Sequence, residues 1–204
     1  MNVLILGRTK MGNSPKRCIG GIAHNGKSVR LMRGADTYWD TSAPFQIGQI
    51  WDITYTPAES TIAPHTENVM VSQYQMAGNQ SNLRAHLLAR VEPWRGSINQ
   101  IFGGMLGYTK DNNGFICQRL GVPGQSTWFW IPDRDLILRG DGKHYDYREG
   151  YLPRGLSYVG EPAALPAIPA GTLIRVSLAT WWKQKEAAPD FEERCYLQLS
   201  GWFL

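Results

Sequence analysis

Short apolar runs, each followed by glycine or polar residues, recur along this chain of 204 residues and predict many short strands. The first run, residues 3–6, ends at Gly7. Two further runs, residues 18–23 and 28–32, flank Asn25-Gly26. This dipeptide between strand-like runs predicts a hairpin with a type I′ turn, because both central residues of that turn need a positive φ. Residues 47–56 and 69–74 each predict another strand.

The pattern changes to a helical period after residue 80. Ser81 can cap a helix that Pro93 ends, and a second helical pattern follows Ser97, although Gly103 and Gly104 disfavour it. The apolar positions that share a face in these two segments are Leu83, Leu87, Leu88 and Val91, and then Ile98, Ile101, Phe102 and Met105.

Strands are predicted again beyond Tyr108, and Asp141-Gly142 marks a second hairpin. Their expected ranges are residues 115–119, 127–131, 136–139, 144–148, 172–178 and 194–203. Two runs of about five strands, joined by a short helical segment, predict a mainly β protein built from two small barrels. We place the barrels at residues 1–78 and 108–204, with a helical connector at residues 79–107.

The composition agrees with many turns and narrows the class of protein. Charged residues make up 19% of the chain, below the usual share of about 25%, while 22 glycines and 12 prolines favour short strands. The three cysteines form no CxxC pair, so we expect neither disulfides nor a metal site, and a reducing cytoplasm is the natural setting. Residues 1–7 lack the features of a signal peptide, and no segment approaches the roughly 20 apolar residues of a membrane span.

Positive charge is concentrated at the start of the chain. Seven of the 21 Lys and Arg residues precede Asp36, the first acidic residue, which leaves 14 cations against 17 acidic residues in the rest. The seven are Arg8, Lys10, Lys16, Arg17, Lys27, Arg30 and Arg33. Such a cluster favours a polyanionic partner whose phosphates replace the missing carboxylates, so we expect these groups to converge on one exposed surface. The alternative is seven solvated side chains without a partner.

Residues 7–14 follow a predicted strand and have the G-x4-G spacing of a phosphate-binding loop. Asn13 stands where that motif needs its lysine, and Pro15 fits poorly with a helix that would start there, so hydrolysis of a nucleoside triphosphate is disfavoured. The loop could still contact phosphate through Arg8, Lys10 and backbone N–H groups. It could equally be a basic turn between strands.

His65 and Glu67 have the H-x-E spacing of zinc deaminases, but no P-C-x-x-C follows. A metal held by His65 alone would lack two ligands, so we reject a deaminase and keep the two residues as a candidate polar pair beside a ligand. A satisfied loop histidine is the alternative. No local motif links any of the three cysteines to a histidine, so we expect them to be free and buried, without a role in catalysis.

Aromatic residues beside cations suggest places where bases could stack. Trp181-Trp182-Lys183-Gln184-Lys185 combines two rings with two cations, as in single-stranded nucleic-acid sites. Because neighbouring strand residues face opposite sides, we expect Trp182 to point outward and Trp181 inward. Tyr38-Trp39 invites a similar interpretation, with core packing as the alternative.

Several motifs resemble the bacterial dual OB-containing domain family. The similarity rests on Gly7-Arg8-Thr9-Lys10, Cys18-Ile19-Gly20-Gly21, Ser28-Val29-Arg30-Leu31, Pro64-His65-Thr66-Glu67 and the segments 172–182 and 193–202. The resemblance implies two OB barrels in tandem, which agrees with the strand count. It also implies recognition of nucleic acid or nucleotides, in a bacterial conflict or antiphage setting, and supplies no catalytic residues.

We therefore expect a binding protein without enzymatic activity or a cofactor, which places RNA or single-stranded DNA across the first barrel. The residues expected to bind it are Arg8, Lys10, Arg30, Arg33, Trp39, His65 and Trp182. Two alternatives stay open. One is a sensor that binds a nucleotide between the barrels, where clefts commonly form. The other is an adaptor whose exposed aromatic residues bind another protein.

Overall fold

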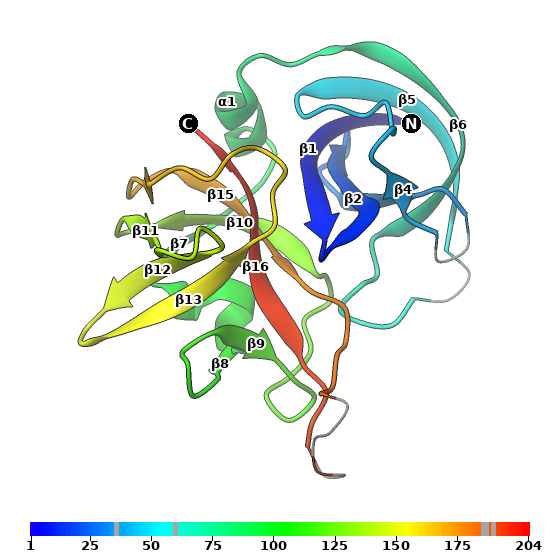
Figure 1. Ribbon diagram of the computed structural model, residues 1–204. Helices are drawn as coiled ribbons and strands as arrows, with labels where there is room; N and C mark the ends of the chain where they lie inside the picture. The colour runs from blue at the N-terminus through cyan, green and yellow to red at the C-terminus, as the bar shows by residue number, and fades with distance from the viewer. Residues whose placement is uncertain (35–36, 59–60, 185–187, 189–190) are drawn as a thin grey trace.

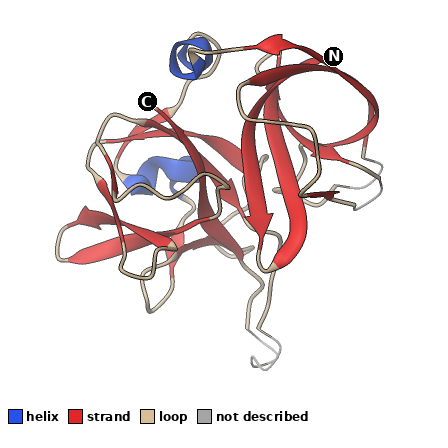
Figure 2. Ribbon diagram, turned by 45° about the horizontal axis from the view of Figure 1, so that its top comes forward, coloured by secondary structure: helices blue, strands red, loops and turns tan. Residues whose placement is uncertain are grey.

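The computed structural model describes the chain except residues 35–36, 59–60, 185–187 and 189–190. Two β-rich units lie side by side, and the long strand β16 (Cys195–Phe203) runs between them (Figure 1). Most of the described chain is strand, with little helix, so the expected mainly β fold is confirmed (Figure 2). Among the described residues no helix is long and apolar enough to cross a membrane.

The first unit is a closed barrel. Its sheet runs in the order β1-β5-β6-β3-β2-β4, and an additional pairing of β1 with β2 closes a ring of five strands. The strands are β1 (Asn2–Met11), β2 (Ser14–Ala23), β3 (Ser28–Met32), β4 (Trp39–Asp40), β5 (Gln49–Pro57) and β6 (Asn68–Asn79). Strand β6 continues beyond the expected 69–74, because all of its length pairs with the curved strand β5.

The hairpin at Asn25-Gly26 forms, but its turn differs from the expected type. Strands β2 and β3 pair antiparallel, and Gly26 has a φ of +82°, whereas Asn25 has no positive φ. The N–H of Gly26 donates to the carbonyl of Ala23, and the N–H of Ala23 donates to that of Lys27. The loop therefore has three residues, with glycine in the left-handed position of a bulge, so only one residue needs a positive φ.

The second unit contains a sheet in the order β14-β11-β12-β13-β16-β15-β10-β7, and β9 joins β16 and β8. Its first strands are β7 (Trp94–Gly96), β8 (Gly107–Tyr108), β9 (Gly114–Ile116), β10 (Thr127–Pro132) and β11 (Leu136–Leu138). The others besides β16 are β12 (His144–Glu149), β13 (Leu152–Tyr158), β14 (Ala167–Ile168) and β15 (Leu173–Leu178). Strand β7 lies within the expected connector and pairs with β10.

Both helical patterns form short helices. Helix α1 (Leu83–Leu88) buries Leu87, but its N-cap is Asn82 rather than Ser81, and the Asn82 side chain accepts a hydrogen bond from the N–H of Ala85. The second segment is the 3₁₀ helix η1 (Ile98–Gly104), capped by Ser97 as expected. Its geometry is broken inside, where Gly103 has a φ of +66°.

Three apolar clusters show how the two units meet. Val3 and Ile5 of β1 point into the core of the first barrel, whereas Leu4 and Leu6 point to the other side. On that side Leu4 and Leu6 join a third apolar cluster, which is shared by both units and also contains Phe129 of β10. Because strand residues alternate between faces, β1 contributes to both clusters at once. We call this contact region the seam; it is apolar near α1 and polar further along.

Candidate anion-binding site between the barrels

Strand β15 is buried on both faces, and this places an arginine in the seam. Ile174, Val176 and Leu178 belong to the core of the second unit. Arg175 and Ser177 alternate with them and therefore face the first barrel. Arg175 is only 6% exposed, although its neighbours in the strand are apolar.

The guanidinium group of Arg175 lies against two glycines of the first barrel. Gly7 of β1 pairs with Gly20 of β2, next to an irregularity in the register. A Cβ atom on Gly7 would lie 2.7 Å from Nη1 of Arg175, and one on Gly20 would overlap Nη2. The two glycines thus leave the space that the guanidinium occupies. Nη1 also donates to Oγ of Ser200 at 2.9 Å, and this hydroxyl donates to the Arg175 carbonyl.

Arg175 forms no ion pair at contact distance with a carboxylate of the described part of the chain. Burial and the positive charge of Arg30 outweigh the opposing effects of Cys18 and Glu67 and lower the pKa of Arg175 to about 10, which keeps it protonated at neutral pH. A buried cation without a counter-ion is unfavourable, and an anion from outside the chain would stabilise it.

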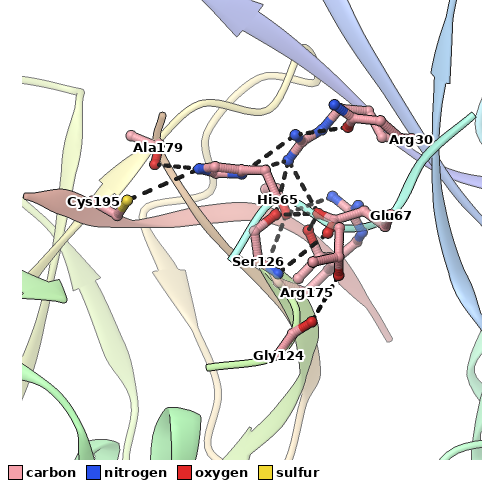
Figure 3. Close-up of polar contacts among 12 residues, drawn as sticks. Arg30, His65, Glu67, Gly124, Ser126, Arg175, Ala179 and Cys195 are labelled. Atoms are coloured by element: carbon pink, nitrogen blue, oxygen red, sulfur yellow. Dashed lines mark hydrogen bonds and ion pairs between the residues drawn. The ribbon is translucent and has the colours of Figure 1, made fainter. Parts of the chain in front are cut away.

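Arg30 of β3 is also buried and belongs to a polar network that crosses the seam (Figure 3). Its Nη2 donates to Oε1 of Glu67 at 3.2 Å and to Oγ of Ser126 at 2.8 Å. Nη1 donates to Oδ1 of Asn68 at 3.2 Å. Ser126, from the second unit, also donates to Glu67. Burial alone would lower the pKa of Arg30, but Cys18, Glu67 and Tyr38 outweigh it and raise that pKa.

His65 links this network to the end of strand β15 and to strand β16. Its Nε2 lies 3.1 Å from the carbonyl oxygen of Ala179, which can only accept, so Nε2 carries the proton. Nδ1 then accepts from the guanidinium of Arg30 at 3.4 Å. Burial and the charge of Arg30 lower the pKa of His65 to about 4, so the ring is neutral at physiological pH.

A pocket of about 440 Å³ opens where the polar part of the seam begins. The cations among its described lining residues are Lys10, Arg30 and Arg175, and this lining contains no carboxylate. The polar uncharged residues around it include Thr9, Cys18, Tyr38, Thr127, Ser177 and Gln198. Glu67 lies behind Arg30 rather than in the pocket wall. The site therefore has an excess of positive charge and several hydrogen-bonding groups, which is the chemistry of an anion site.

The seven early cations do not converge on one exposed surface as expected. Arg8 is buried, and its guanidinium donates to Glu161 and to the carbonyls of Thr41, Ala43 and Phe45. Arg17 donates to the same carboxylate at 2.9 Å. Both side chains therefore tie the first barrel to the second, because Glu161 supplies the anion that the N-terminal segment lacks. The expected phosphate contact of Arg8 is replaced by these bonds.

The remaining early cations divide between the pocket and the surface. Lys10 is exposed and lines the pocket with Arg30. Arg33 is exposed and forms an ion pair with Asp40 at 3.6 Å. Lys16 and Lys27 are exposed and do not line the pocket. Among the early cations, only Lys10 and Arg30 thus lie together at the pocket.

The two expected stacking residues have different surroundings. Trp39 is only 7% exposed and packs edge-on against Phe45, with ring centroids 4.9 Å apart, so it belongs to the core of the first barrel. Because it is buried, Trp39 offers no face on which a base could stack. Trp182 is 50% exposed and contacts Tyr196, while Trp181 is half-buried. Lys185 lies outside the described residues.

The segment 7–14 does not form the loop between a strand and a helix that the G-x4-G motif requires. Strand β1 continues to Met11, and a tight turn at Gly12, with a φ of +57°, leads into β2. The pairing of Met11 with Ser14 shows a hairpin, which is the alternative interpretation of this segment. Lys10 reaches the pocket because it lies near the end of this hairpin.

The sequence does not predict two features of the site. Arg175 lines the pocket, and the signal in the sequence is an arginine within the largely apolar run of residues 173–178. Cys18 was expected to be buried but is half-exposed and lines the pocket, whereas Cys117 and Cys195 are buried; all three are free. No group of three metal-binding side chains occurs among the residues that the structure describes.

The fold and the seam define a protein of two packed β units with a cation-lined pocket between them. The family model of the dual OB-containing domain matches residues 1–202, and the chain belongs to this family. The resemblance noted in the sequence is therefore confirmed. No curated protein and no solved structure matches the chain.

Proposed function

We propose that this protein binds a phosphate-bearing ligand of the nucleotide class in the pocket between the two units. The observation that carries the proposal is the pair Arg30 and Arg175, both more than nine-tenths buried and both lining a pocket whose described wall contains no carboxylate. Membership of an OB-containing family supports a ligand of nucleic-acid type, because OB folds bind oligonucleotides. We propose binding without catalysis.

The size of the pocket favours a single nucleotide unit. A volume of about 440 Å³ lies in the range of small-molecule sites, roughly 300–1,000 Å³. Tyr38 in the pocket wall could contact a base, while the cations hold the phosphate. The phosphate would approach Arg175, and Lys10 at the exposed rim would shield the remaining charge.

A single-stranded nucleic acid is the second candidate, and the position of Trp182 favours it. Its exposed ring follows Thr180, which lines the pocket, so a base next to a bound nucleotide could stack there. The bacterial defence role that the family resemblance implies belongs to the same proposal, with a nucleotide or a nucleic acid as the recognised molecule.

The test is isothermal titration calorimetry with a panel of nucleotides and short oligonucleotides, together with thermal unfolding of each mixture. We expect a bound ligand to raise the melting temperature by mass action. Lys10→Gln should weaken binding about tenfold or more, since a charge-assisted hydrogen bond contributes roughly 1.5–3 kcal/mol. Arg33→Gln removes an exposed cation outside the pocket and should leave binding unchanged. Absence of binding across the panel, or an equal loss in both variants, would refute the proposal.

A further inference from the structure

We propose that the group recognised in this pocket is a terminal phosphate monoester, either of a free nucleotide or of the end of a strand, and that an internal phosphodiester is excluded. This inference rests on the proposed function and specifies the ligand of the same site. Three features carry it: the depth of Arg175, the balance of charges around the pocket, and the enclosure of the pocket by both units.

Arg175 can be reached only by a group that enters the seam. Its side chain is fixed from behind by Gly7 and Gly20 of the first barrel and by Ser200 of the second unit. Only 6% of the residue is exposed, so the guanidinium cannot move out to meet a ligand on the surface without losing these contacts. A phosphate that contacts it must therefore lie inside the pocket rather than across its mouth.

A terminal phosphate fits this position better than an internal one. An internal phosphate continues into a sugar on both sides, whereas a terminal phosphate has one ester link and can enter with its free oxygens first. The walls come from both units, with Lys10 and Arg30 on one side and Thr127, Arg175 and Gln198 on the other. The pocket holds about one nucleotide by volume, so a chain leaving in two directions would not fit.

The charges lead to the same group. Lys10, Arg30 and Arg175 contribute three positive charges, Glu67 behind Arg30 contributes one negative charge, and His65 is neutral. The net charge of these groups is therefore two positive charges. A phosphate monoester carries close to two negative charges at neutral pH and a diester carries one, so only the monoester neutralises the site.

Hydroxyl groups complete the surroundings of such a group. Thr127 and Ser177 line the pocket from neighbouring strands β10 and β15, which pair at these two residues. Both are at least nine-tenths buried. The hydroxyl of Thr127 donates to Oε1 of Glu67 at 3.5 Å, whereas that of Ser177 can donate to a phosphate oxygen beside Arg175.

Fluorescence anisotropy with one labelled oligonucleotide sequence in three forms tests this inference: with a 5′-phosphate, with a 3′-phosphate, and with hydroxyls at both ends. A nucleoside monophosphate and the cyclic 3′,5′-diester of the same nucleoside form the matched small-molecule pair. We expect at least one phosphorylated end to bind about tenfold more tightly than the hydroxyl form, and the monoester about tenfold more tightly than the cyclic diester.

Variants test whether this preference depends on residues of the pocket. Arg175→Lys keeps the charge but loses the paired donors, so it should weaken binding of the phosphorylated end and reduce its advantage over the hydroxyl end. Lys10→Gln, at an exposed position, provides a second variant that leaves the buried packing intact, and Arg33→Gln is the control. Equal binding of phosphorylated and hydroxyl ends, and of monoester and diester, overturns the inference while the proposed function stands. If none of these molecules binds, the proposed function itself fails.

Discussion

The guanidinium of Arg175 occupies the space that a side chain on Gly20 would need: a Cβ atom there would lie 2.9 Å from Cζ and closer still to Nη2. The two residues belong to different β units, β15 and β2, so this contact joins the units beside the cation-lined pocket. Gly20 therefore has a packing role that its strand position does not require, since its φ is not positive.

Gly20→Ala should displace Arg175 and weaken binding of a nucleoside monophosphate. The new methyl group must push the guanidinium out of its buried position, and overpacking of this kind costs roughly 1–3 kcal/mol of stability. Thermal unfolding and calorimetric titration measure the two effects. Gly78→Ala is the matched control, because a Cβ at Gly78 meets nothing within 4 Å and its φ is not positive. Equal behaviour of the two variants would contradict the assigned role of Gly20.

The strand pattern was readable from the sequence wherever residues follow a simple period. Residues 28–32 and 172–178 form strands close to the expected bounds, because apolar and turn residues define them locally. Strand β13 is not predicted, since Pro153 and Gly155 interrupt its pattern. It pairs with the preceding strand β12 and with β16, which lies far away in the sequence. Local signals do not report such distant pairing.

The site was predictable only in part, for a different physical reason. Arg30 and His65 were singled out from their residue types, and the structure places both at the seam. Their depth could not be inferred, because the sequence does not show that the second unit covers them. Arg8 illustrates the same limit: its partner Glu161 lies 153 residues further along the chain. A cation that seems uncompensated in sequence can thus be paired in space.

Acidification should destabilise the fold through His65. The pKa of His65 is lowered to about 4 in the folded state from 6.5, so the unfolded state binds more protons between these values. The contribution of neutral His65 to the free energy of unfolding is complete above pH 6.5 and is lost as pH falls through about 4. It amounts to at most about 3 kcal/mol. Urea unfolding at several pH values measures this. His65→Gln should flatten the dependence, while His24→Gln, at an exposed position, should preserve it; the reverse result would contradict the assignment.

Removal of the charge of Glu67 should destabilise the seam strongly. Glu67 is the carboxylate paired with buried Arg30, and Ser126 donates to it as well. Glu67→Gln leaves the guanidinium without its counter-ion, which typically costs about 3–5 kcal/mol. Chemical denaturation gives the change in unfolding free energy. Asp52→Asn removes an exposed ion pair with the N-terminus and should cost less than about 1 kcal/mol. A cost for Glu67→Gln as small as that would show that the network contributes little.

Cys18 should be the first cysteine to react with a maleimide. It is half-exposed in the pocket wall, whereas Cys117 and Cys195 are buried, and burial raises the pKa of Cys195 to about 12. Mass spectrometry of peptides after timed labelling follows each thiol. A nucleoside monophosphate should slow the labelling of Cys18, because the ligand fills the space beside it. Labelling of Cys18 that a saturating ligand leaves unchanged would place the ligand elsewhere.

Glu161 should stabilise the packing of the two units through its arginine partners. Partial burial opposes its ionisation, but hydrogen bonds from Arg17 and Arg8 outweigh burial and lower the pKa of Glu161. Glu161→Gln keeps the shape and removes the charge, so we expect a loss of about 1–3 kcal/mol, the usual range for hydrogen bonds to charged groups. Arg8 would keep its bonds to three carbonyl groups, which limits the effect.

Urea unfolding at low and high salt separates this ion pair from exposed charges. The effect of Glu161→Gln should persist at 1 M salt, where screening acts over about 3 Å, because Arg8 is buried. Glu193→Gln removes a carboxylate at an exposed position and should change stability by less than about 0.5 kcal/mol. If both variants behave alike, Glu161 is an ordinary surface residue. The early cations would then lack the stabilising partner that the structure assigns to them, and Arg8 would depend on its carbonyl bonds alone.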